Sequence, residues 1–105
     1  MATITLHKNC KLTPSSMNAV QRETVSFAFN TAGTLNLDPS SFFGQGSISS
    51  DGNLTIQAGV NSTCTITVAS GTCTPTAGVG SAGDADSCVI TVTSEDPGAG
   101  GGKKY

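Results

Sequence analysis

The four cysteines of this 105-residue chain are the residues whose type and spacing could most directly do chemistry. Cys10, Cys64, Cys73 and Cys88 are separated by 53, 8 and 14 residues, whereas a zinc site needs closely spaced ligand pairs. His7 and Cys10 form an H-x-x-C pair, which is half of such a site. An even number of cysteines in a short chain with few large apolar residues predicts a disulfide framework instead, with free buried thiols as the alternative.

One pairing of these cysteines is favoured by their positions. A bridge between Cys73 and Cys88 would close a loop of about 15 residues. By restricting the unfolded chain, it would stabilise the folded protein by on the order of 3 kcal/mol. That assignment pairs Cys10 with Cys64. Four cysteines allow three connectivities, so the other two pairings stay open at this point.

Residues arranged for catalysis are not visible in the sequence. His7 is the sole histidine and lies in an expected strand with no visible nucleophile partner, and no Gly-x-Ser-x-Gly elbow occurs. Gly78, Gly80 and Gly83 match G-x-G-x-x-G, but a strand follows them where a dinucleotide site needs a helix. We therefore expect a non-enzymatic protein with no catalytic residue and no cofactor.

Calcium is the metal for which the sequence offers weak candidate ligands. Asp84 and Asp86 lie two residues apart in a Gly-rich and Ser-rich loop, and Asp51 lies two residues before Asn53. Ca²⁺ takes six to eight oxygen ligands, which neither group assembles locally. Aspartates in turns more commonly accept hydrogen bonds from their own backbone, so no metal is expected.

The charge distribution argues against two classes of partner. The chain carries five basic and seven acidic residues, and the basic ones form no run. Nucleic-acid binding depends on clustered Lys and Arg against phosphates, and binding to a membrane surface needs a similar patch. No apolar run has the length of a transmembrane helix. We expect neither nucleic acid nor membrane as a partner, but a protein surface.

Period-two alternation of apolar and polar residues predicts about seven short strands. They are expected at residues 2–7, 24–30, 33–37, 46–50, 53–57, 62–69 and 87–93. Asp51-Gly52, Ala58–Asn61 and Ser70-Gly71 are typical of hairpin turns between consecutive strands. Residues 14–23 could hold one helical turn. This pattern predicts an all-β fold, a small antiparallel β-sandwich.

The chain divides into two parts by composition. Residues 1–97 are expected to form the sandwich, and residues 98–105 a flexible glycine-rich tail or arm that cannot pack a core. The tail ends in Lys103, Lys104 and Tyr105. These three side chains could contact a partner, and a frayed terminus is the alternative.

Residues 24–68 carry a resemblance to known modules. "TVSFAFNTAGTLNLDPSSF" followed by "GNLTIQAGVNSTCTITV" resembles immunoglobulin-like β-sandwich modules of bacterial surface proteins and of phage virions. In those modules an aliphatic strand, an Ala-Gly turn and a Ser/Thr-rich strand form a hairpin. The resemblance covers under half of the chain, and the cysteines depart from the usual cysteine-free modules.

The resemblance implies a passive structural role. We expect a decoration or cement protein at the virion surface that binds neighbouring coat subunits or its own copies and forms a homo-oligomer, so that avidity multiplies weak contacts. The alternative is an adhesin or cell-surface module, extracellular in location. A carbohydrate-binding accessory domain ranks third, because such domains usually display Trp or Tyr platforms and this chain has no Trp and one Tyr.

Overall fold

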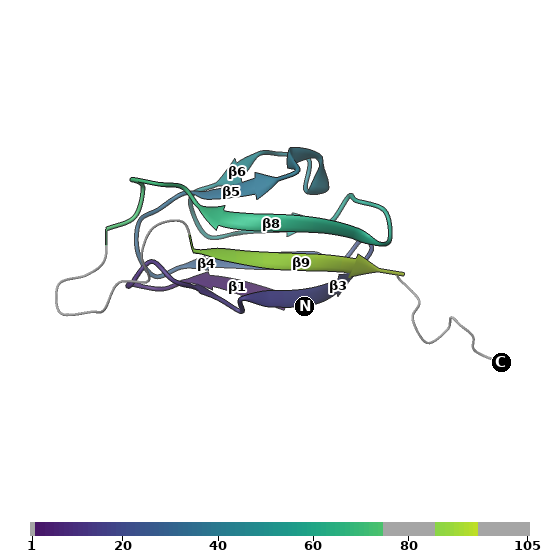
Figure 1. The fold of residues 1–105 in the computed structure, drawn as a ribbon, viewed down its shortest axis with the longest axis horizontal. Helices are drawn as coiled ribbons and strands as arrows, with labels where there is room; N and C mark the ends of the chain where they lie inside the picture. The colour runs from purple at the N-terminus through teal and green to yellow at the C-terminus, as the bar shows by residue number, and fades with distance from the viewer. Residues whose placement is uncertain (1, 75–85, 95–105) are drawn as a thin grey trace.

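The described part of the chain, residues 2–74 and 86–94 of the computed structural model, forms two stacked β-sheets (Figure 1). One sheet has the strand order β2-β1-β4-β7 and the other β3-β9-β8-β5-β6. The elements are β1 (Ala2–Leu6), β2 (Leu12–Thr13), β3 (Ser16–Val20), β4 (Thr24–Phe29), β5 (Leu35–Asp38), the 3₁₀ turn η1 (Ser40–Phe42), β6 (Ser47–Ile48), β7 (Gly52–Thr55), β8 (Ser62–Val68) and β9 (Ser87–Thr93). The predicted all-β, two-sheet sandwich is confirmed.

Both sheets are mixed, whereas the sequence predicted purely antiparallel pairing. β1 runs parallel to β4, and β3 runs parallel to β9. The helical turn considered for residues 14–23 is wrong, because this segment contains β3. Met17 and Ala19 of β3 lie opposite Ile90 and Val92 of β9 and face the core, so burying these two side chains favours an edge strand over a helix.

Two of the three predicted hairpin turns are wrong, while Ser70-Gly71 follows β8, which pairs antiparallel with β9, the next described strand. β6 and β7 lie in different sheets, and so do β7 and β8, so Asp51-Gly52 and Ala58–Asn61 connect strands across the sandwich. The segment after Ser70-Gly71 contains no strand in its described residues, 72–74. Alternation identifies which side chains face inward, but it does not identify which strand lies beside which. Which strands pair is decided when the apolar faces of the two sheets are buried against each other.

The core lies between the two sheets and is made of the inward side chains of almost every described strand. Ile4 and Leu6 of β1 and Ile66 of β8 have no exposed surface. Phe43 packs edge-to-face against Phe27 and Phe42, with ring centroids 5.9 Å and 4.9 Å apart. Among the described residues no polar or charged side chain is buried, so the core is held by apolar packing and the strand hydrogen bonds.

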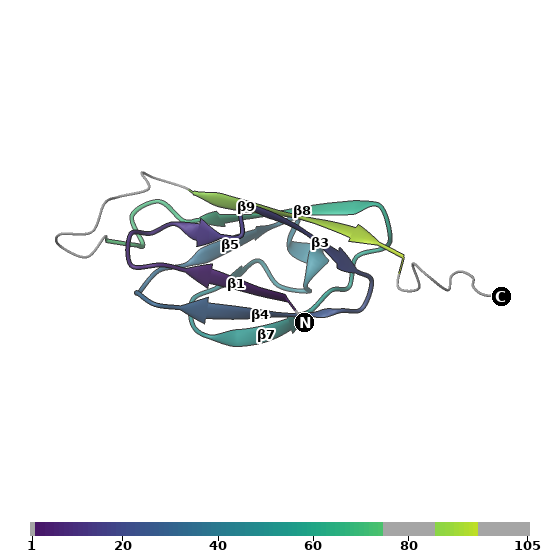
Figure 2. The same ribbon diagram turned by 90° about the horizontal axis from the view of Figure 1, so that it is seen from below.

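The two ends of the sandwich differ, and Figure 2 shows both. β1 and β4 run in the same direction and end together, with Leu6 beside Phe29. The backbone N–H of Asn30 donates to the carbonyl oxygen of Leu6 at 2.9 Å, so the loops after β1 and β4 leave the sheet side by side. We call this the loop end. The opposite end, where the turn of residues 21–23 joins β3 to β4, is the far end.

The domain prediction concerns residues that are only partly described. The sandwich occupies residues 2–74 and 86–94. The proposed tail of residues 98–105, with Lys103, Lys104 and Tyr105, lies outside the described residues, and its role as an arm stays a prediction. Within the described residues, no helix has the length and apolar character needed to cross a lipid bilayer.

Candidate functional site

The loop end gathers three segments that are distant in sequence. They are residues 7–11 between β1 and β2, residues 30–34 between β4 and β5, and residues 69–74 after β8. The backbone N–H of Ala69 donates to the carbonyl oxygen of Thr34 at 2.8 Å, and the N–H of Thr34 donates to Oγ1 of Thr72 at 3.0 Å. These bonds hold the second and third segments together as one surface.

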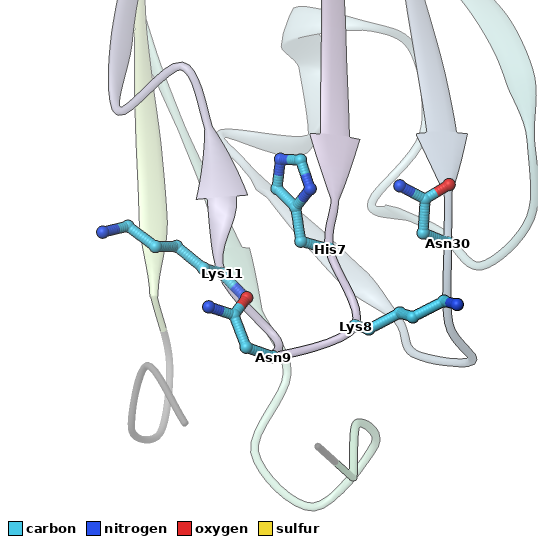
Figure 3. A pocket seen from close by; sticks show the side chains of 5 residues that line it. All are labelled: His7, Lys8, Asn9, Lys11 and Asn30. Atoms are coloured by element: carbon cyan, nitrogen blue, oxygen red, sulfur yellow. The ribbon is translucent and has the colours of Figure 1, made fainter. Parts of the chain in front are cut away.

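An open depression of about 450 Å³ lies at the loop end. Its lining is polar and basic, and comprises His7, Lys8, Asn9, Lys11 and Asn30. Figure 3 shows the imidazole of His7 in the middle, with Lys8 extending toward the strand of Asn30 and Lys11 extending in the opposite direction. The two ammonium groups therefore flank the depression and do not converge on one point.

The segment that carries both lysines is held in one conformation by local hydrogen bonds. The N–H of His7 donates to the carbonyl oxygen of Lys11, and the N–H of Cys10 donates to that of His7, both at 2.9 Å. The N–H of Lys11 donates to Oδ1 of Asn9 at 3.0 Å, a side-chain bond typical of Asn in turns. Cys10 adopts a φ of 67°, a left-handed conformation that is uncommon for a residue other than glycine.

A disulfide joins this segment to the loop after β8. It links Cys10 to Cys73, with the Cα atoms 6.0 Å apart. A Cβ on Gly33 would lie 2.8 Å from Cδ2 of Leu6 and 3.4 Å from Cβ of Cys73. The segment of residues 30–34 thus passes close to the disulfide, and a glycine lies at the point of closest approach. All three segments of the loop end are tied to one another.

The predicted pairing of the cysteines is wrong. Cys10 bonds to Cys73 and not to Cys64, and Cys88 is free. Cys64 lies in β8 and Cys88 in β9, where both side chains belong to the core, while Cys10 and Cys73 lie in neighbouring loops. The prediction expected Cys73 and Cys88 to lie opposite each other, but the fold brings Cys73 to Cys10, 63 residues away in sequence.

The free thiols of Cys64 and Cys88 lie on adjacent strands, in diagonal positions of the register. Cys64 is opposite Ile90, and Cys88 is opposite Ile66. Burial raises the pKa of each thiol from 9.0 to about 11, because the thiolate would lose its hydration. The charge of Asp86 raises the pKa of Cys88 further, whereas a hydrogen bond with the backbone of Asp38 lowers the pKa of Cys64 and partly offsets the effect of burial. Both groups are protonated at neutral pH and act as apolar side chains.

The candidate calcium ligands are engaged with the backbone. Oδ2 of Asp86 accepts the N–H of Leu12 at 2.7 Å, and Oδ1 of Asp51 accepts the N–H of Phe29 at 2.6 Å. Asp84 lies outside the described residues. Across residues 2–74 and 86–94, no group of three or more His, Cys, Asp or Glu side chains is placed to hold a metal ion. The two described aspartates stabilise the strand ends that frame the depression.

His7 has a partner that the sequence did not indicate. Its Nε2 lies 2.6 Å from Oγ1 of Thr13. Thr13 faces Thr5 across the β1–β2 pair, and His7 follows Thr5 by two residues, so both side chains extend from the outer face of the sheet. The bond between them is exposed, and it fixes the direction of the ring beside the depression.

Lys8 and Lys11 are exposed at the loop end. Within the described residues neither ammonium group makes an ion pair or a hydrogen bond. The surrounding outer faces of the sheets are largely hydroxylated: β8 presents Thr63, Thr65 and Thr67 outward, and none is charged. The sequence shows Lys8 and Lys11 three residues apart but not that Asn30 joins them, because that contact arises from the parallel register of β1 and β4.

No protein-family model matches the chain, and no curated protein sequence matches it significantly.

Proposed function

We propose that this chain is an immunoglobulin-like, non-enzymatic binding module that attaches to a protein surface through its loop end, as a decoration or cement protein of a virion does. The observation that carries the proposal is the construction of that end. Two lysines that have no ion-pair partner among the described residues line a depression. Its three segments are joined by the Cys10–Cys73 disulfide and by backbone hydrogen bonds. Rigid loops presented by a sandwich are a common arrangement for binding sites.

The direction of the strands supports the loop end as the contact surface. β1 runs toward the loop end and β9 runs away from it, so Ala2 and Ser94 both lie on the far side of the sandwich. Figure 1 shows the end of β9 opposite the loops. The described chain therefore begins and ends at the far end, away from the depression. A coat subunit or a second copy of the chain is the partner we propose.

The disulfide supports a location outside a reducing cytosol. Disulfides persist at virion and cell surfaces and in extracellular proteins, whereas cytosolic thiols are kept reduced. We place the protein at a virion surface, and the disulfide favours equally the second candidate, an adhesin or cell-surface module. The two candidates differ in the particle or cell fraction with which the protein associates.

Density-gradient fractionation of the organism that encodes the chain tests this proposal. We expect the chain, detected by mass spectrometry, to sediment with assembled particles, and light scattering of the purified protein to show a homo-oligomer. Recovery with the cell envelope alone would favour the adhesin. Recovery as a monomer in the soluble cytosol would contradict both candidates.

A further inference from the structure

The chemistry of the depression indicates what kind of partner segment it binds. We propose that it binds an extended, acidic segment of a partner protein, with carboxylates on the segment paired to Lys8 and Lys11. This inference rests on the proposed function and specifies the partner surface that the loop end recognises. It follows from the placement of the charges, from the amide side chains between them and from the rigidity of the segment that carries them.

The positions of the two ammonium groups favour a ligand with separated charges. Lys8 and Lys11 extend to opposite sides of His7 (Figure 3). A single phosphate or sulfate is bound best by donors that converge on it, and most tightly by the planar fork of arginine. Two lysines that diverge suit two carboxylates at different points along one chain. An extended acidic peptide provides that spacing, because every second side chain points to the same side and lies about 7 Å further along the chain.

The amide side chains suit a peptide backbone lying between those carboxylates. Asn9 accepts the N–H of Lys11 through Oδ1, and Figure 3 shows its amide nitrogen on the side away from that bond. Asn30 is exposed and lines the other side of the depression. A primary amide donates and accepts hydrogen bonds as a peptide group does, so the two asparagines can bind main-chain groups of the segment.

The small number of cations at the site suits a short acidic segment better than a polyanion. Lys8 and Lys11 are the lysines of the depression, and the carboxylates of Asp51 and Asp86 accept backbone N–H groups at the same end. Nucleic acids and sulfated polysaccharides bind by having many charges neutralised at once. Two cations give weak binding to such polymers, but they are enough to select carboxylates on a protein.

The rigidity of the segment adds to affinity. Residues 7–11 are held by two backbone hydrogen bonds, the Asn9 side chain and the disulfide to Cys73. Because these groups are already ordered, binding orders little more of this backbone. Ordering of the lysine side chains still opposes binding, so we expect the isolated segment to bind weakly and several copies to bind by avidity.

An NMR titration of the ¹⁵N-labelled protein tests the inference. The probe is an eight-residue peptide in which glutamates alternate with serines, and the matched control peptide has glutamine at each glutamate position. We expect the acidic peptide to shift amide signals of residues 7–11 and 30–34. We expect Lys8→Gln with Lys11→Gln to weaken binding about three- to tenfold, and Arg22→Gln, an exposed cation at the far end, to leave the affinity unchanged.

Three results of that titration would overturn the inference. They are equal binding of the glutamine peptide, shifts centred outside the loop end, and no loss of affinity in the double lysine variant with its spectrum otherwise native. A heparin oligosaccharide provides a further arm, and tighter binding of heparin than of the peptide would assign the site to polyanionic sugars instead.

Co-sedimentation of the same variants with purified particles separates the two proposals. If the wild-type chain and the double lysine variant associate equally with particles, the proposed function stands and the acidic-segment inference fails. If the wild-type chain binds the acidic peptide but no particle or cell surface, the proposed function fails and the depression is left as a peptide site. If the wild-type chain binds particles and the double lysine variant does not, both proposals are supported.

Discussion

The two pairs of cysteines occupy regions of opposite character. Cys10 and Cys73 lie in loops and form a disulfide beside the basic depression. Cys64 and Cys88 lie in the core on adjacent strands, are free and have raised pKa values. The same residue type thus cross-links the exposed loop end and fills the apolar core. The comparison shows that the described core contains free thiols and no cross-link, whereas the loop end carries a covalent bond between two of its segments.

The largest effect is expected from removing that tie. Replacing both Cys10 and Cys73 with serine should lower the free energy of unfolding by about 4 kcal/mol, because a bond across 63 residues restricts the unfolded chain strongly. Urea denaturation of the double variant measures the loss. An unchanged urea midpoint would mean that hydrogen bonds hold the loop end. The disulfide would then not set the stability of the loop end apart from that of the core.

The next effect concerns the core beside the free thiols. Ile66 has no exposed surface and lies opposite Cys88. Ile66→Ala should lower the free energy of unfolding by about 3 kcal/mol, because it removes buried methyl groups and leaves a cavity. Ile66→Val is the matched control with an expected loss of about 1 kcal/mol. Equal losses for the two variants, measured in urea, would show that the core relaxes around this position.

Alkaline pH should separate the two cysteine pairs. The pKa of each free thiol is about 11 in the folded protein and about 9 when unfolded. Above pH 9 the unfolded chain loses these protons while the folded chain retains them, so stability should fall between pH 9 and pH 11. The expected slope is about 1 kcal/mol per thiol for each pH unit.

The double variant Cys64→Ala, Cys88→Ala is the control for that slope. It should lose most of the dependence on pH, since the disulfide does not titrate. Intact mass after alkylation in denaturant should show two modified thiols and one disulfide. Modification of both thiols in the native protein at pH 8, where burial keeps them protonated and covered, would contradict the assignment of Cys64 and Cys88 to the core.

The smallest effect on stability is expected at the depression itself. Lys8 and Lys11 are exposed and unpaired among the described residues, so replacing both with glutamine should change the free energy of unfolding by less than about 0.5 kcal/mol. Thermal unfolding monitored by circular dichroism measures this. A loss as large as that of Ile66→Ala would mean that the lysines stabilise the fold, and would remove the reason to assign them to binding.

Alternation of side chains was sufficient to locate most of the fold. All seven predicted strands overlap observed ones, and the clearest pattern, Val25, Phe27 and Phe29, corresponds to β4. β2 and β3 were missed because Leu12–Thr13 is too short to show a period and Ser16–Val20 has only Met17 and Ala19 facing inward. Edge strands bury few side chains and therefore leave a weak pattern in the sequence.

The candidate site was less predictable than the strands. Lys8 and Lys11 are two of the five basic residues in the sequence, and no local pattern links them to Asn30. The contact depends on β1 lying beside β4 in parallel, which brings His7 and Asn30 to the same end of the sheet. The predicted disulfide pairing is wrong for a related reason, since no local signal shows that the loops of Cys10 and Cys73 lie side by side.

The amino-acid sequence by itself determined the class of structure: frequent turns, hydroxylated strand faces and inward Ile, Leu, Val and Phe specify a two-layer sheet protein. The alternation of side chains along a strand shows only which of them face the core and which face solvent. It depends on adjacent residues and carries no information about which strands lie side by side. Tertiary structure alone decided which strands pair, which cysteines bond and which loops form the basic depression, because those outcomes depend on how the two apolar faces close over each other.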